Sequence, residues 1–107
     1  MKKGMIKVSV LYPNGDGKTF DMDYYCSKHM PMVERLLGDA LKGVTVEKGL
    51  GGGAPGSPAP NVAMGNLYFD TIQAFENSFG PNAESFMADL PNFTNIEPIV
   101  QISVVQI

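Results

Sequence analysis

Residues 51–60 (GGGAPGSPAP) constrain the fold of this chain more than any other segment. Four Gly and three Pro in this run exclude the interior of a helix or a sheet, so we expect a long exposed loop. β-Branched residues precede it in 41–50, and an apolar run follows it in 62–69. This pattern predicts two strands that pair antiparallel across the loop.

The part of the chain before 41–50 predicts a strand followed by a helix. Residues 5–12 alternate between two sets of side chains, as a strand with two different faces does. Asp21 is a candidate N-cap and Gly38 a candidate stop, so we expect a helix between them. The apolar positions of this helix recur at three- and four-residue steps and form one stripe: Met22, Tyr25, Cys26, His29, Met30, Val33, Leu36 and Leu37.

The part of the chain after the loop repeats this order of a helix and a strand. Thr71, alone or together with Asp70, is expected to cap a second helix, and Gly80 and the following proline are expected to stop it. Residues 82–89 predict one or two further helical turns, and residues 98–106 predict a final β-rich strand. In the further turns we expect two side chains to point inward, those of Phe86 and Met87.

The predicted order is strand, helix, strand, strand, helix, strand. This is the ferredoxin-like βαββαβ arrangement, an α+β fold with a four-stranded antiparallel sheet and two helices on one face. A chain of 107 residues has the length of one domain. We place this single domain at 5–107, with residues 1–4 as an N-terminal extension.

Apolar residues occupy both faces of several predicted strands. Two helices cover only one face of such a sheet, so a monomer would expose the other, and a large exposed apolar patch usually marks an interface. We therefore expect a homodimer that forms through the sheet faces. The alternative is a sheet wetted on one side with scattered surface Val and Ile. The residues concerned include Leu11, Leu67, Phe69, Ile102 and Val104.

Charge and cysteine content exclude several partners. Eight Lys and Arg against eleven Asp and Glu give a net charge of −3, which argues against nucleic acid or an anionic membrane as partner. One Cys excludes an internal disulfide, and with a single His it excludes the usual zinc sets, so we expect no metal and no cofactor. No apolar run approaches the ~20 residues that span a bilayer, so we expect the cytoplasm as the compartment.

His29 is the only histidine and the leading candidate for chemistry. It lies on the apolar stripe, and Pro31 follows two residues later. Pro31 cannot donate to the carbonyl of Ser27, so the helix should kink or end beside His29. A partly buried imidazole is well placed to act as a general acid or base. The alternative is a packed histidine whose nitrogens are bonded to backbone.

Two tyrosines and the cysteine lie close to His29 in this prediction. Tyr25 precedes His29 by one helical turn, so the two side chains can touch. Tyr12 ends the first strand, where a side chain can point into a cleft above the sheet. Either hydroxyl could orient the histidine or donate to a substrate, and either ring could equally be core. Cys26 could contact His29, but inert cysteine is far more common than a nucleophile.

Four further residues are candidate ligand contacts. Met22 and Met30 lie around the expected kink and could give an adaptable apolar pocket. Asn66 interrupts an apolar strand, so it could line a polar spot in a cavity or face solvent. Tyr68 is a weaker candidate of the same kind as Tyr12.

The chain resembles the EthD family, whose name refers to ethyl tert-butyl ether degradation. The combination of a Tyr-Tyr…Lys-His-x-Pro motif with a glycine loop is a specific signal, and the resemblance covers residues 5–107. It rests on MIKVSVLYP at 5–13, FDMDYY at 20–25, KHMPM at 28–32, GLGGGAPG at 49–56, VAMG at 62–65 and IVQIS at 99–103.

This resemblance implies the dimeric α+β barrel superfamily, in which two ferredoxin-like sheets meet face to face. Related barrels include muconolactone-type isomerases, quinone-forming monooxygenases of antibiotic pathways and haem-handling enzymes. A histidine in a Tyr-x-x-x-His-x-Pro helix serves catalysis in some of them, which implies catalytic roles for Tyr25 and His29.

The leading hypothesis is a small homodimeric enzyme of a catabolic or biosynthetic pathway. It would bind an apolar lactone-, quinone- or ether-derived molecule between helices and sheet, with His29 as acid or base and Tyr25 or Tyr12 orienting. The reaction would be an isomerisation or a cofactor-independent oxidation. One alternative is a binding or accessory protein of a monooxygenase system without turnover. Haem binding through His29 is the least favoured.

Overall fold

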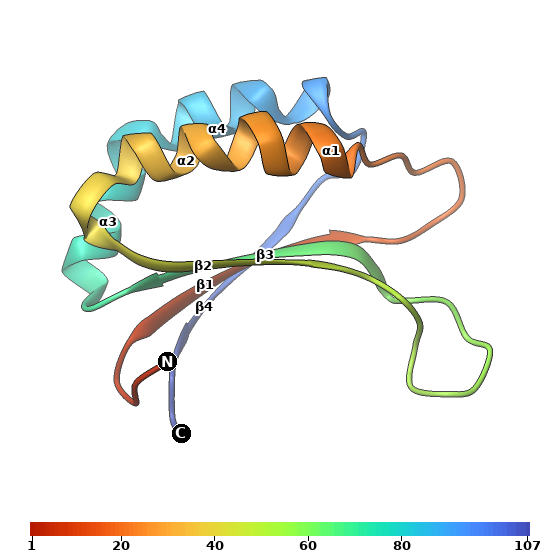
Figure 1. The fold of residues 1–107 in the computed structure, drawn as a ribbon, viewed down its shortest axis with the longest axis horizontal. Coiled ribbons are helices and arrows are strands. Elements are labelled where there is room, and N and C mark those ends of the chain that lie inside the picture. The colour runs from red at the N-terminus through yellow and green to blue at the C-terminus, as the bar shows by residue number, and fades with distance from the viewer.

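The computed structural model describes all residues, 1–107, and contains one sheet of four antiparallel strands. The strands are β1 (Ile6–Pro13), β2 (Leu41–Lys48), β3 (Asn61–Phe69) and β4 (Ile99–Val104). Their order in the sheet is β2-β3-β1-β4, and both helical segments cover the same face (Figure 1). This confirms the predicted ferredoxin-like α+β fold.

The first helical segment consists of α1 (Met22–Tyr24), a π-helical turn (Tyr25–His29) and α2 (Met30–Leu37). Asp21 caps its first turn, and Gly38 ends it with a φ of 58°, a conformation that glycine adopts at little cost. Both ends are therefore as predicted. Pro31, the second residue of α2, neither ends nor breaks the segment, because the π-helical turn before it accommodates the proline.

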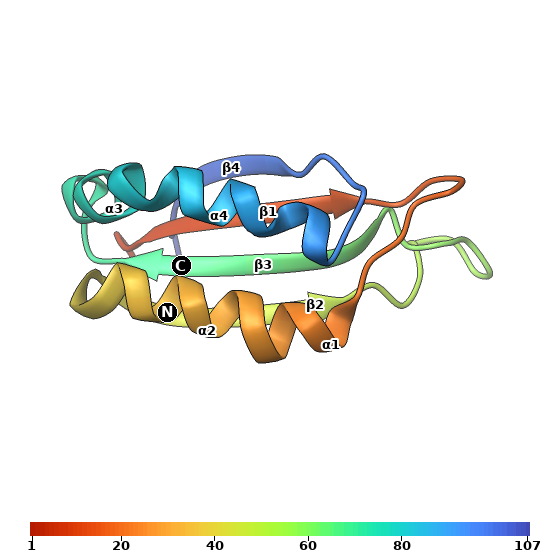
Figure 2. The same ribbon diagram turned by 90° about the horizontal axis from the view of Figure 1, so that it is seen from above.

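The second helical segment does not stop at Gly80 as predicted, and the further turns predicted at 82–89 follow it directly. Thr71 caps α3 (Ile72–Phe79), and a 3₁₀ turn at Gly80–Asn82 continues into α4 (Ala83–Asp89). A further 3₁₀ turn follows the end of α4. In Figure 2 the two helical segments lie side by side over the sheet and run in opposite directions, so the start of α1 lies near the end of α4. None of these helices has the length and apolar character needed to cross a membrane.

The core lies between the helices and the sheet, and three expected inward side chains are not in it. Phe86 is buried as predicted, whereas Met87 beside it is 67% exposed. Cys26 and Leu36, which belong to the predicted stripe, are also exposed. The predicted stripe rests on a constant 3.6 residues per turn. A π-helical turn has more residues per turn, so the side chains within and beyond it are rotated about the helix axis away from their predicted positions.

The expectation that both faces of the sheet are apolar is only partly correct. Strand register places Leu67 and Phe69 on the helix-covered face, opposite Val8 and Ile6, where both are buried. On β4, Val100, Ile102 and Val104 belong to the same face, because they pair with Val10, Val8 and Ile6 of β1. Ile102 and Val104 are about half exposed, at 49% and 51%, because β4 is the edge strand beyond the reach of the helices.

The uncovered face of the sheet carries a polar row between apolar positions. Thr45, Asn66, Ser9 and Gln101 are in register across all four strands. Leu11, with its register partners Met64 and Ile99, forms the adjacent apolar row, which Glu47 ends on β2. This face is therefore mixed, with one apolar band beside one polar band.

The glycine- and proline-rich residues 51–60 form the predicted loop between β2 and β3. They contain neither helix nor strand, and Leu50 at the start of the loop is almost fully exposed. The loop projects past one end of the sheet (Figure 1), away from the helices.

Candidate functional site

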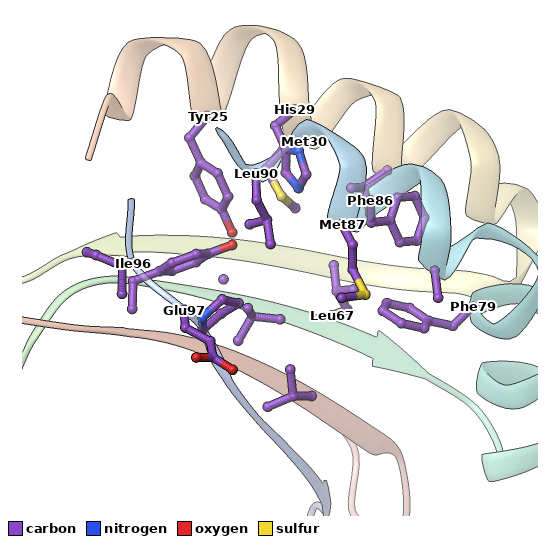
Figure 3. A pocket seen from close by; sticks show the side chains of 17 residues that line it. Tyr25, His29, Met30, Leu67, Phe79, Phe86, Met87, Leu90, Ile96 and Glu97 are labelled. Atoms are coloured by element: carbon purple, nitrogen blue, oxygen red, sulfur yellow. The ribbon is translucent and has the colours of Figure 1, made fainter. Parts of the chain in front are cut away.

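A cavity of about 330 Å³ lies between the helices and the sheet. Its size is at the lower end of the range for small-molecule sites, and thirteen of its seventeen lining residues are hydrophobic. Side chains from both helical segments, β1, β3 and the start of β4 point into it (Figure 3). The lining residues are Val10, Tyr12, Tyr25, His29, Met30, Val33, Gly65, Leu67, Phe79, Ala83, Phe86, Met87, Leu90, Ile96, Glu97, Pro98 and Val100.

The π-helical turn places His29 at this cavity. Its last residue is His29, and the following backbone N–H, that of Met30, donates to the carbonyl of Tyr25 five residues back. The Tyr25 and His29 rings therefore stack, with centroids 5.4 Å apart and planes inclined by 14°. Only 5% of His29 is exposed, and Figure 3 shows its ring directed from the helix toward the cavity.

His29 is held by a carboxylate of the opposite helical segment. Its Nδ1 lies 2.9 Å from Oδ2 of Asp89, the last residue of α4. The other ring nitrogen, Nε2, makes no hydrogen bond within the chain and is not sealed from solvent. A carboxylate acceptor favours the tautomer with a proton on Nδ1, which leaves a lone pair on Nε2.

Asp89 is itself held in place by two further donors. The hydroxyl of Tyr24 and the side-chain amide of Asn92 both donate to its Oδ1, each at 2.8 Å. Desolvation acts to raise the pKa of Asp89, but hydrogen bonds from Asn92, His29 and Tyr24 outweigh it and hold that pKa below its usual range. The carboxylate is therefore ionised at neutral pH.

Tyr12 and Tyr25 place two hydroxyl groups at the floor of the cavity. Their ring centroids are 5.6 Å apart, and both residues are buried. Burial raises the pKa of Tyr25 to about 12. Burial raises the pKa of Tyr12 further, and the neighbouring Tyr25 adds to this rise. Both hydroxyls are therefore protonated at neutral pH and can donate hydrogen bonds. Gly65 lies beneath them on β3, where any Cβ would collide with the Tyr25 hydroxyl.

Aromatic rings fix the orientation of His29 from a second side. Phe93, just after α4, packs on His29 with centroids 4.6 Å apart and on Tyr25 with centroids 5.1 Å apart. Phe20 contacts both Phe93 and Tyr12. The histidine is therefore packed against aromatic rings and hydrogen-bonded to a carboxylate.

The structure brings together some of the predicted site residues and not others. Tyr12, Tyr25, His29 and Met30 all line the cavity. The other three predicted contacts do not line it: Met22, Asn66 and Tyr68.

These three residues have other surroundings, and we do not place them in the site. Met22 accepts a weak contact from the Cys26 thiol at 3.7 Å. Asn66 and Tyr68 alternate along β3 with cavity-lining Leu67, so they point to the uncovered face of the sheet. There the amide of Asn66 donates to Glu47 at 2.6 Å.

Sequence reasoning missed Asp89, Phe93 and Glu97. No local motif marks them, because Asp89 meets His29 only through the packing of two segments sixty positions apart. The available signal was topological: antiparallel helices place the end of the second segment beside the start of the first. No three His, Cys, Asp or Glu side chains gather into a group that could hold a metal ion.

Comparison with known proteins assigns this chain to one family. The EthD domain matches residues 17–97, which is most of the chain. The chain belongs to the EthD family. An EthD-like protein from Ralstonia eutropha is 43% identical, with a TM-score of 0.92, and the match covers 99% of this chain and 96% of that protein. No curated protein matches the chain.

Two more distant structures share the fold of this EthD-family chain. A dimeric ferredoxin-like protein of unknown function from Thermobifida fusca is 14% identical, with a TM-score of 0.63 and coverage of 98% of this chain and 94% of that one. A protein from Bordetella bronchiseptica, provisionally assigned as an antibiotic biosynthesis monooxygenase, is 11% identical, with a TM-score of 0.60 and coverage of 99% and 100%. At these identities the similarity concerns the fold alone.

Proposed function

We propose that this EthD-family protein binds a small apolar molecule in the cavity and moves a proton on it. The observation that carries this proposal is the environment of His29. His29 lines an apolar cavity, and its Nδ1 is hydrogen-bonded to Asp89, whereas its Nε2 has no hydrogen-bond partner in the chain. A histidine oriented from behind by a carboxylate, with its second nitrogen free, is suited to general acid or base catalysis.

The proton transfer would proceed through Nε2. This nitrogen would remove a proton from a C–H group beside a carbonyl, or from a hydroxyl, while Asp89 stabilises the resulting imidazolium. The protonated hydroxyl of Tyr25 would donate to the substrate oxygen on which negative charge develops. Return of the proton at another atom of the same molecule completes an isomerisation. A cofactor-independent oxidation by dioxygen would begin with the same proton removal.

A ligand screen followed by a turnover assay tests this proposal. Lactones, quinones and short ethers would be screened by thermal shift, and compounds that bind would be assayed with the wild type and with His29→Gln. Gln keeps a polar side chain but cannot transfer a proton in this way. We expect turnover to fall by at least about 100-fold with little loss of binding. Binding without turnover in the wild type would instead support the accessory-protein alternative, and an equally active variant would refute a role for His29.

We further propose that the protein is a homodimer formed through the uncovered face of the sheet. The apolar row of Leu11, Met64 and Ile99 supports this, since a monomer leaves it open to water. The polar row beside it would then meet its symmetry-related copy, where Thr45, Asn66, Ser9 and Gln101 offer both donors and acceptors. The Thermobifida fusca protein of the same fold is described as dimeric, which supports a dimer.

A further inference from the structure

Charge is unevenly distributed around the cavity. None of the eight Lys and Arg residues of the chain lines it. His29 is the one lining side chain that can become positive, and Asp89 directly behind it supplies a compensating negative charge. A protonated His29 therefore forms a neutral pair, and a neutral His29 leaves this side of the cavity negative.

A second acidic residue, Glu97, lies on the side of the cavity opposite His29. Ile96, Glu97 and Pro98 all line the cavity, so the segment that leads into β4 forms one of its sides. Ile96 is buried and anchors this segment, whereas Glu97 is exposed. Glu97 therefore lies where the cavity meets solvent, and Figure 3 shows its carboxylate directed away from His29.

The remainder of the lining favours a flat, uncharged ring. Tyr12, Tyr25, Phe79 and Phe86 present four aromatic side chains, and aliphatic residues supply most of the rest. Aromatic walls pack well against ring systems in offset or edge-on arrangements. The polar groups available to such a ring are the two tyrosine hydroxyls and Nε2 of His29, which match one hydroxyl or carbonyl oxygen.

From these observations we infer that the substrate is an uncharged ring compound with a single hydroxyl or carbonyl end, and that Glu97 excludes anions such as carboxylates. This inference rests on the proposed function of the same cavity and narrows its substrate class. A carboxylate that enters the cavity loses water and finds no cation to replace it. It must also pass Glu97, whose like charge opposes it at the mouth. A lactone or quinone without a free acid group meets neither obstacle.

Two probes that share one ring system test the inference. Naphthol is uncharged at neutral pH and carries one hydroxyl, whereas naphthoate carries a carboxylate on the same rings. Their affinities would be measured by calorimetry with the wild type, Glu97→Lys and Glu84→Lys. Glu84 is an exposed acid of α4 that does not line the cavity, so Glu84→Lys makes the same change in net charge elsewhere.

We expect the wild type to bind naphthol at least about tenfold more tightly than naphthoate. Glu97→Lys should tighten naphthoate binding much more than it changes naphthol affinity and so narrow this gap, whereas Glu84→Lys should keep the wild-type affinities for both probes. Equal affinity of the wild type for both probes would overturn the inference, as would an unchanged gap in Glu97→Lys.

The charge inference and the proposed function can fail independently of each other. If naphthol and naphthoate both bind with equal strength and His29→Gln still abolishes turnover of a ligand found by screening, the charge inference is wrong and the function stands. If neither probe binds or shifts the melting temperature, the cavity is not a site for ring compounds, and this inference fails with it.

Discussion

Nδ1 of His29 lies 2.9 Å from Oδ2 of Asp89, although sixty positions separate the two residues in the chain. The contact joins the π-helical turn of the first helical segment to the last residue of α4. It forms because the two segments run antiparallel over the same face of the sheet (Figure 2). A long-range hydrogen bond therefore fixes which nitrogen of His29 faces the cavity.

Asp89→Asn should reduce turnover more than binding. An amide at this position can present its NH₂ group to Nδ1 and favour the wrong tautomer, in which Nε2 carries the proton and cannot act as a base. We expect kcat to fall by about 100-fold or more while KM changes little. Asp39→Asn, the same change at an exposed acid that does not line the cavity, is the matched control. A large rise in KM with unchanged kcat would show that Asp89 acts on binding instead.

Stability should fall in acid partly through Asp89. The pKa of Asp89 is lowered in the folded protein, since hydrogen bonds to the carboxylate outweigh desolvation. A group of this kind contributes stability that is fully present above its unfolded-state pKa and is lost as the pH falls through its folded-state pKa. We expect the free energy of unfolding of Asp89→Asn to depend less steeply on acid pH than that of the wild type. Urea unfolding at a series of pH values measures this, and parallel pH profiles would contradict it.

Gly65→Ala should damage the floor of the cavity. The added methyl group would collide with the hydroxyl of Tyr25, which must move away from its position beside Tyr12. Overpacking of this kind costs about 1–3 kcal/mol of the free energy of unfolding. Gly80→Ala is the control, because a Cβ there meets no atom within 4 Å and Gly80 has helical dihedrals. Equal stability of the two variants would show that Tyr25 does not depend on Gly65.

Leu11→Glu should separate the proposed dimer. Of the apolar strand residues that the sequence analysis named, Leu67 is buried under the helices, whereas Leu11 lies on the uncovered face. A buried carboxylate without a partner at the interface costs several kcal/mol of association free energy, so sedimentation velocity should show a monomer. Leu36→Glu, on the exposed side of α2, should remain dimeric. A wild-type monomer at micromolar concentration would refute the dimer.

The sequence was sufficient for the fold because its signals are local. Asp21 and Thr71 cap the two helical segments, Gly38 ends the first, and residues 51–60 exclude regular structure. Each of these effects acts within a few residues and needs no tertiary contact.

The details that local signals do not determine were missed. Pro31 predicted a distortion beside His29, but not that one π-helical turn would absorb it and leave Cys26 in solvent. Met87 was expected inside by periodicity; it lines the cavity but remains 67% exposed, and periodicity does not distinguish a buried position from one at an open cavity. Asp89 could not be paired with His29, nor Glu97 assigned to the cavity, because only the packed fold brings these residues to their places.

Nitrogen chemical shifts of the single histidine test the central claim most directly. One histidine gives one set of ring signals in a long-range ¹H–¹⁵N correlation spectrum, so no assignment is needed. At a pH where the ring is neutral, we predict a protonated Nδ1 and an unprotonated Nε2, and we predict that a ligand bound in the cavity shifts Nε2 more than Nδ1. A proton on Nε2 with a bare Nδ1, or an Nε2 signal that a bound ligand leaves unchanged, would contradict the account.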